Sequence, residues 1–237
     1  MNGDQRDHRH SIGPMRRRLA SIEAAAIAGV VCAIGWSLSL RGLLAAPALG
    51  ADRATIAAYY AQPEHGAAAI LWLQVLAFST IAFLWFVGVI RSRIGGREPM
   101  LVGTVFFGGS ILLAALLFLG ASLLAAPAVL VAVGDVAPEP GSTELLRAAA
   151  AVVLSVFLPR VATLVMFSTA SLGRATGALP RWLVIATMVV GVVELVNVTI
   201  STPTVFLVPV WIGVVSVVLL VRRPTDAVDA DDVVGAP

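Results

Sequence analysis

The stretch SVFLPRVATLVMFSTAS, residues 155 to 171, decides how the fold of this chain is interpreted. It is apolar enough for the middle of a membrane helix, yet it contains Arg160 directly after Pro159. A permanent charge at the centre of a membrane helix costs at least about 2.5 to 3.5 kcal/mol. We therefore expect Arg160 to face the interior of a helix bundle and to find a partner there.

The composition around this stretch is that of an integral membrane protein. Of the 237 residues, 59% are hydrophobic and 13% are charged, and the mean hydropathy is +0.94. Water-soluble domains are about half apolar and about a quarter charged. The net charge of +2 comes from arginines spread along the chain, which argues against a nucleic-acid partner. The partner that this composition predicts is the lipid bilayer.

Six apolar segments are long enough to cross a hydrocarbon core of about 30 Å, which takes about 20 helical residues. They cover residues 19–40, 67–90, 100–124, 146–172, 182–201 and 204–221. The sequence therefore predicts an all-α, polytopic membrane protein, with six transmembrane helices in one bundle that occupies residues 19–221. Residues 1–18 and 222–237 are polar and are expected to be a disordered basic tail and a disordered acidic tail.

The arginine positions predict the orientation of these helices, because positive residues gather in short cytoplasmic loops. With the N-terminus inside, twelve arginines lie on the cytoplasmic side: Arg6, Arg9, Arg16, Arg17, Arg18, Arg91, Arg93, Arg97, Arg174, Arg181, Arg222 and Arg223. Only Arg41, Arg53 and Arg147 lie outside. Both termini are therefore expected in the cytoplasm, and the expected location is the plasma membrane.

One residue of the fifth segment is the natural partner of Arg160. Arg160 lies 13 residues before Gly173, and Glu194 lies 13 residues after Arg181. At 1.5 Å per residue, both lie about 20 Å from the loop that joins their two helices. We therefore predict an intramembrane ion pair between Arg160 and Glu194.

Pro159 is expected to kink the helix and to offer Arg160 a second partner. It has no N–H for the carbonyl of Ser155, so the guanidinium can donate to that freed oxygen. Two interpretations of the pair stay open. It is a structural clamp over the kink, or it belongs to a path for an ion, a proton or a substrate, with Asn197 as a polar neighbour one turn outward. Gln74, in the second segment, is expected to hydrogen-bond to an adjoining helix.

Small residues mark a packing surface on the first segment. They recur every fourth position, at Ala25, Gly29, Ala33 and Ser37. Such a stripe lets another helix approach closely, either within the bundle or from a second protein.

Motifs of catalysis and metal binding are missing from the sequence. There is no histidine cluster with metal spacing, no nucleophile elbow and no phosphate-binding glycine loop. The single cysteine, Cys32, cannot form an internal disulfide. We therefore expect neither an enzyme nor a bound metal or cofactor.

Three segments of the chain resemble a known family. They are FLWFVGVIR at 83–91, FSTASLGRATGALPRWL at 167–183 and PVWIGVVSVVLLVRR at 209–223. They are similar to the small six-helix membrane proteins, widespread in actinobacteria, that are known only as a domain of unknown function. The resemblance runs from about Tyr59 to Arg223. It implies a six-helix architecture in the plasma membrane, and it implies no catalytic or binding residue.

From these features we expect a non-enzymatic accessory or scaffold subunit of a membrane complex. Its partners would be other membrane-protein subunits or a second copy of itself, and a lipid or envelope transport complex would be a natural host. The alternative is a small transporter or channel whose polar path passes Arg160, Glu194 and Asn197. The sequence shows no inverted repeat and no pair of broken helices that would favour this alternative.

Overall fold

Long apolar helices make up most of the chain that the computed structural model describes, which is residues 12–94, 100–134, 136, 138–177, 179–197 and 202–221. The helices are α1 (Ile12–Leu43), α2 (Arg53–Tyr60), α3 (Pro63–Ile94), α4 (Met100–Gly134), α5 (Pro140–Val152), α6 (Leu158–Thr176), α7 (Arg181–Val196) and α8 (Leu207–Val221). A π-helical turn, η1 (Val153–Phe157), joins α5 to α6, and a 3₁₀ turn, η2 (Thr202–Phe206), precedes α8. No strand occurs in these ranges, and the predicted all-α class is confirmed.

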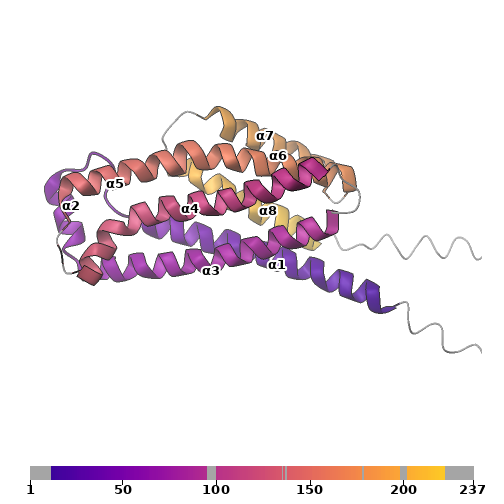
Figure 1. The fold of residues 1–237 in the computed structure, drawn as a ribbon, viewed down its shortest axis with the longest axis horizontal. Helices are drawn as coiled ribbons and strands as arrows, with labels where there is room; N and C mark the ends of the chain where they lie inside the picture. Colours follow the sequence, from indigo (N-terminus) through magenta and orange to yellow (C-terminus); the bar gives the residue numbers. More distant parts are fainter. Residues whose placement is uncertain are drawn as a thin grey trace, which may run out of the picture.

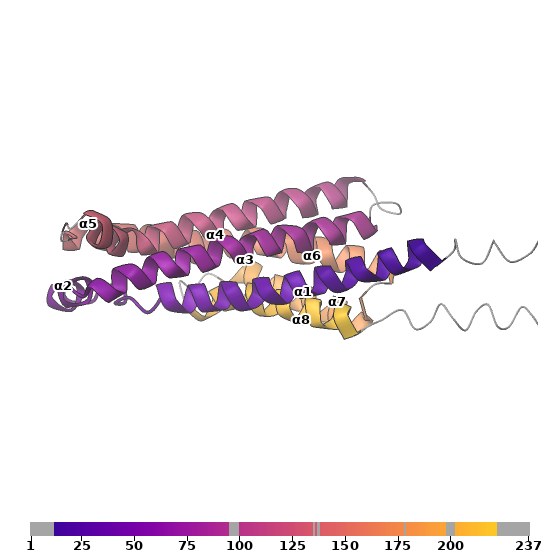
Figure 2. The same cartoon turned by 90° about the horizontal axis from the view of Figure 1, so that it is seen from below.

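The long helices lie alongside one another in one bundle (Figures 1 and 2). α1 packs against α3 and α8, α4 packs between α3 and α6, and α7 packs on α6. The short helix α2 and the start of α5 lie at one end, which we call the α2 end (Figure 1). The start of α1, the turn between α6 and α7 and the end of α8 lie at the opposite end (Figure 1).

Five helical segments of the described chain are long and apolar enough to cross a membrane. They are Ala26–Leu43, Pro63–Gly88, Leu101–Gly134, Pro140–Ala175 and Thr204–Val221. The predicted segment 182–201 is the exception, because its helix, α7, has 16 residues and ends at Val196. At 1.5 Å per residue such a helix is about 24 Å long, which is short of a hydrocarbon core of about 30 Å.

The predicted N-terminal tail is partly helical. α1 begins at Ile12, so residues 12–18 belong to a helix although they were expected to be disordered. Residues 1–11 and the predicted C-terminal tail, 222–237, lie outside the described residues.

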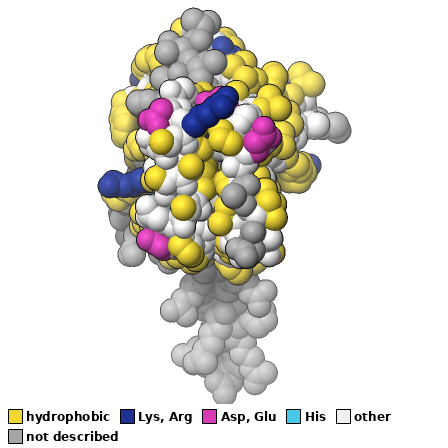
Figure 3. All heavy atoms as spheres, turned by 90° about the vertical axis from the view of Figure 1, so that its left-hand side faces the viewer, with side chains coloured by type: hydrophobic (Ala, Val, Ile, Leu, Met, Phe, Trp, Pro, Cys, Tyr) yellow, Lys and Arg dark blue, Asp and Glu magenta, His cyan; other side chains and the backbone are white. Residues whose placement is uncertain are grey.

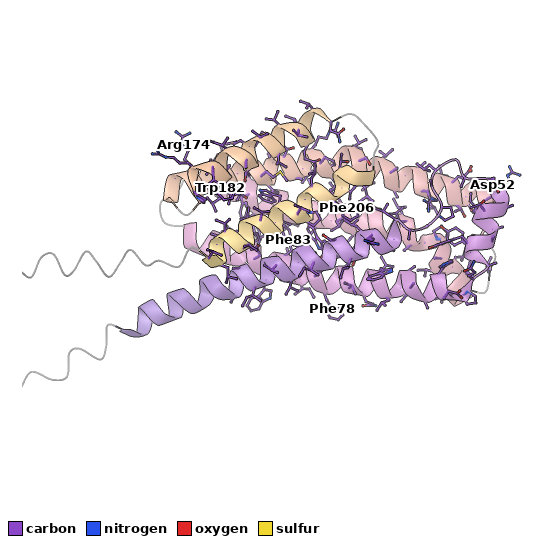
Figure 4. All side chains as sticks on the ribbon, turned by 180° about the vertical axis from the view of Figure 1, so that it is seen from behind. Asp52, Phe78, Phe83, Arg174, Trp182 and Phe206 are labelled. Atoms are coloured by element: carbon purple, nitrogen blue, oxygen red, sulfur yellow. The ribbon has the colours of Figure 1, made fainter. Side chains whose placement is uncertain are left out.

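Each helix buries one face and leaves other apolar side chains exposed, as a membrane protein requires. On α3, Phe83 is 1% exposed and points into the bundle, whereas Phe78 is 70% exposed and points away from it (Figure 4). Two indole groups of the core donate hydrogen bonds between helices. Trp36 Nε1 donates to Thr80 Oγ1 at 3.0 Å, and Trp211 Nε1 donates to Thr187 Oγ1 at 3.1 Å.

The small-residue stripe of α1 is used inside the bundle. A Cβ atom at Gly29 would collide with the side chains of Ser216 on α8 and Phe86 on α3. A Cβ atom at Gly213 on α8 would lie 3.3 Å from that of Ala33. The hydroxyl of Ser37 donates to Ala33 O at 2.7 Å, within α1 itself. Ala25 lies in α1, and its side chain is outside the described residues.

Candidate functional site

The candidate site lies on the antiparallel hairpin of α6 and α7. The hydroxyl of Thr163 on α6 donates to Gly191 O on α7 at 3.0 Å, and this bond fixes the register of the two helices. Arg160 lies three residues before Thr163, and Glu194 lies three residues after Gly191. Because the helices are antiparallel, Arg160 and Glu194 lie at one level. We call Arg160, Glu194 and Asn197 the polar centre.

The guanidinium of Arg160 binds two backbone oxygens. Its Nη1 donates to Ser155 O at 3.1 Å, and its Nη2 donates to Asn197 O at 2.8 Å. Ser155 belongs to the π-helical turn η1, and its carbonyl is the one that Pro159 leaves without an N–H donor. The helix irregularity before Pro159 therefore takes the form of a π-helical turn, a feature that is frequent at functional sites.

The predicted ion pair is not made as a direct contact. Neither carboxylate oxygen of Glu194 accepts a hydrogen bond from the described residues, although Glu194 and Arg160 lie at one level of the hairpin. The reason is the end of α7. The last carbonyls of a helix lack intrahelical donors and carry a partial negative charge, so they compete with the carboxylate for a guanidinium. Arg160 reaches past Glu194 to Asn197, the residue that follows the last turn of α7.

Glu194 is fully buried, with 0% of its surface exposed. It lies on the buried face of α7, together with Leu183, Thr187 and Gly191. Buried polar atoms in proteins almost always have a hydrogen-bond partner, and a buried carboxylate without one is costly. The carboxylate of Glu194 therefore lacks the partner that its burial calls for among the described residues.

The hydrogen bond predicted for Gln74 is not made among the described residues. Its side chain is exposed on α3 and forms no hydrogen bond with the described residues. The inward face of α3 is set by Ala69, Leu76 and Phe83, which are all buried. Gln74 precedes Leu76 by two residues, which turns it about 200° around the helix axis and away from the bundle.

A cavity of about 320 Å³ lies near the α2 end. Its walls come from the connection after α1, from α4, from α5 with η1, and from η2. The lining residues are Leu44, Ala46, Ala48, Leu49, Leu124, Arg147, Ala151, Leu154, Ser155 and Val205. Ser155 belongs to this wall, and its carbonyl oxygen accepts the hydrogen bond from Arg160. The hydrogen bond between Arg160 and Ser155 O therefore links the wall of the cavity to the polar centre.

The buried cation of this cavity could not be found by hydropathy. Arg147 is 7% exposed, whereas the sequence placed it only as one of three outside arginines. One feature of the sequence points to the burial of Arg147. It shares a helix face with Ala151 and Ser155, because the three residues are spaced four positions apart.

A second pocket, of about 800 Å³, lies at the turn between α6 and α7. Arg174 and Arg181 line it. Arg174 and Asp52 lie at opposite ends of the molecule (Figure 4). Between this pocket and the polar centre the hairpin is tightly packed. A Cβ atom at Gly191 would lie 2.6 Å from the ring of Phe167, and Met166 is fully buried.

Comparison with protein-family models, with curated proteins and with solved structures finds no match to this chain. The resemblance to small six-helix membrane proteins therefore stays a prediction. The described residues contain no group of three His, Cys, Asp or Glu side chains that could hold a metal ion.

Proposed function

We propose that the chain is a multi-pass plasma-membrane protein with six transmembrane helices and both termini in the cytoplasm. Five helical segments meet the length and hydropathy of a span. α7, which packs along α6, would be the sixth pass, although its 16 residues are shorter than a full hydrocarbon core (Figure 1). The described ends of α1 and α8 lie at one end of the bundle, as an even number of passes requires. The excess of arginine at that end favours the cytoplasmic side. The α2 end then faces the outside.

Within this topology, we propose that the protein is not an enzyme but a passage for small anions. The observation that carries the proposal is Glu194, a fully buried carboxylate without a hydrogen bond, at the level of a guanidinium that binds only neutral carbonyls. Charged residues inside membrane helices mark the paths of ions and substrates in many transport proteins. The cavity near the α2 end would form the outer part of such a path, because its wall includes Ser155, whose carbonyl oxygen binds Arg160.

The chemistry of the passage follows from the donors of Arg160. A guanidinium has five N–H donors, and the two backbone bonds leave others free to receive an anion. The bound carbonyls carry no net charge, so the positive charge of Arg160 is not cancelled by them. Glu194 carries a negative charge at the level of Arg160. It would therefore compete with a passing anion for the guanidinium of Arg160. Glu194 therefore acts as a gate.

One of the reasons to expect a scaffold function was the small-residue stripe of α1. The α1 stripe was expected to be available to partners, but Gly29 and Ala33 pack against α8 of the same chain. The geometry therefore favours the passage over the scaffold.

Replacing Glu194 with glutamine is expected to raise anion flux several-fold. The amide keeps the shape of the carboxylate and removes the competing charge. The measurement reconstitutes the purified protein in liposomes with a potassium ionophore and follows swelling in isosmotic potassium chloride, acetate or benzoate. Because potassium is made freely permeant, the rate of swelling reports the entry of the anion.

The control is Glu64→Gln, which neutralises an exposed carboxylate near the start of α3. It is expected to match the unmodified protein. Swelling no faster than that of empty liposomes with all three anions would overturn the passage. A rate that stays equal or falls in Glu194→Gln would overturn the gate.

A further inference from the structure

The cavity near the α2 end contains a buried cation, and no described acidic side chain lines the cavity beside it. Arg147 is 7% exposed, and its Nε and Nη1 atoms have no hydrogen-bond partner. Its one hydrogen bond runs from Nη2 to Ala46 O at 3.3 Å, which is long for a charged donor. No acidic side chain is among the residues that line the cavity.

The acidic side chains that the structure describes near the α2 end lie on the surface. Asp52, Glu64, Glu139 and Glu144 are all exposed. Figure 3 looks onto this end and shows acidic and basic side chains scattered over its surface. Asp52 is engaged locally, because Thr55 donates to it from its backbone N–H at 2.9 Å and from its hydroxyl at 2.6 Å. These hydrogen bonds lower the pKa of Asp52.

Two further buried hydroxyls at the α2 end have no partner among the described residues. Thr143 is one turn earlier on the same buried face of α5, is 1% exposed, and has no partner for its hydroxyl. Tyr60, on α2, is 2% exposed, and its hydroxyl also has no partner. Burial raises the pKa of the neighbouring Tyr59, and Tyr60 adds to the rise while the positive charge of Arg147 opposes it. Of these side chains, Arg147 is the one that lines the cavity and keeps donors for a negative group.

We propose that this cavity binds a small carboxylate with an apolar body, held by the guanidinium of Arg147. A guanidinium pairs with a carboxylate through two parallel hydrogen bonds. One positive charge lines the cavity, which matches a monoanion. The rest of the wall is largely apolar, with Leu44, Leu124 and Leu154 among its members. The volume of about 320 Å³ is at the lower end for small-molecule pockets, which run from about 300 to 1,000 Å³.

The assignment of this carboxylate as the substrate rests on the proposed passage, whereas its binding does not. The experiment therefore measures binding without flux. Equilibrium dialysis of labelled benzoate against the full-length protein in mild detergent is expected to show saturable binding at one site per chain. Benzamide, which has the same shape without the charge, and inorganic phosphate, which lacks the apolar body, are expected not to compete.

Replacing Arg147 with glutamine is expected to weaken benzoate binding about tenfold or more, since a charge-assisted hydrogen bond is lost. The matched control is Arg53→Gln, at an exposed arginine of α2 near the same end. It is expected to bind like the unmodified protein. Ala151→Leu, which fills the wall of the cavity, tests the site independently and is expected to abolish binding while the protein stays folded.

Absence of saturable benzoate binding to the unmodified protein would overturn the site, as would equal competition by benzamide. Equal competition by phosphate would overturn the apolar part of the assignment. Binding that survives in both Arg147→Gln and Ala151→Leu would place the ligand elsewhere and overturn it as well. Benzoate binding without swelling in any of the three potassium salts would keep the site and remove the passage, so the two proposals fail in different ways.

Discussion

Replacing Arg160 with methionine is expected to cause a large loss in the free energy of unfolding. The variant loses the hydrogen bonds to Ser155 and Asn197 and leaves Glu194 without the opposite charge at its level of the hairpin. A hydrogen bond to a charged group contributes about 1.5 to 3 kcal/mol, so the loss of both bonds removes a large share of the stability of most proteins. The measurement is thermal unfolding in mild detergent, followed through the buried thiol of Cys32, which a fluorogenic reagent labels only when the bundle opens.

The control for this prediction is Arg174→Met, on the same helix. Arg174 is exposed at the end of α6. A surface substitution of this kind is expected to change stability by no more than about 0.5 kcal/mol. Equal losses in the two variants would contradict the role given to Arg160.

Replacing Gly29 with valine is expected to produce the second large loss of stability. α1 and α8 touch at Gly29, where any Cβ atom collides with Ser216 and Phe86. Overpacking at a close contact costs about 1 to 3 kcal/mol, and sometimes more. The same Cys32 labelling measures the loss, because Cys32 lies one turn away on α1.

Gly108→Val is the matched control for Gly29→Val. Gly108 lies in α4, and a Cβ atom there would have no neighbour within 4 Å. Its stability is expected to stay close to that of the unmodified protein. Similar losses in the two variants would mean that the helix propensity of valine, and not the contact with α8, sets the effect.

Hydropathy predicts the class of the fold and most of its long helices, because length and apolarity are what a bilayer requires. It does not predict where α7 ends. The hydropathy of the segment led us to include residues 197–201 in the predicted span. In the structure, Asn197 has an extended backbone and α7 ends at Val196. A hydropathy sum does not distinguish helical from extended residues, so it does not place the end of α7 at Val196.

The level of the polar centre could be predicted, but its contacts could not. Counting residues from the α6–α7 turn places Arg160 opposite Glu194, and the register of the hairpin agrees. Which acceptor Arg160 binds depends on where α7 exposes its last carbonyls, and that position follows from the end of the helix. The helices are also apolar on all sides, so their sequences do not tell which face of α3 carries Gln74.

The measurement that tests the polar centre most directly is a double-mutant cycle between Arg160→Met and Glu194→Gln. If the two charges act on each other across the hairpin, Glu194→Gln should restore part of the stability lost in Arg160→Met. We expect a coupling free energy of about 1 to 3 kcal/mol, within the range for residues that share a network. If the stability losses of the two single variants add up to that of the double variant, the account is contradicted. Arg160 and Glu194 would then lie at one level of the hairpin without acting on each other.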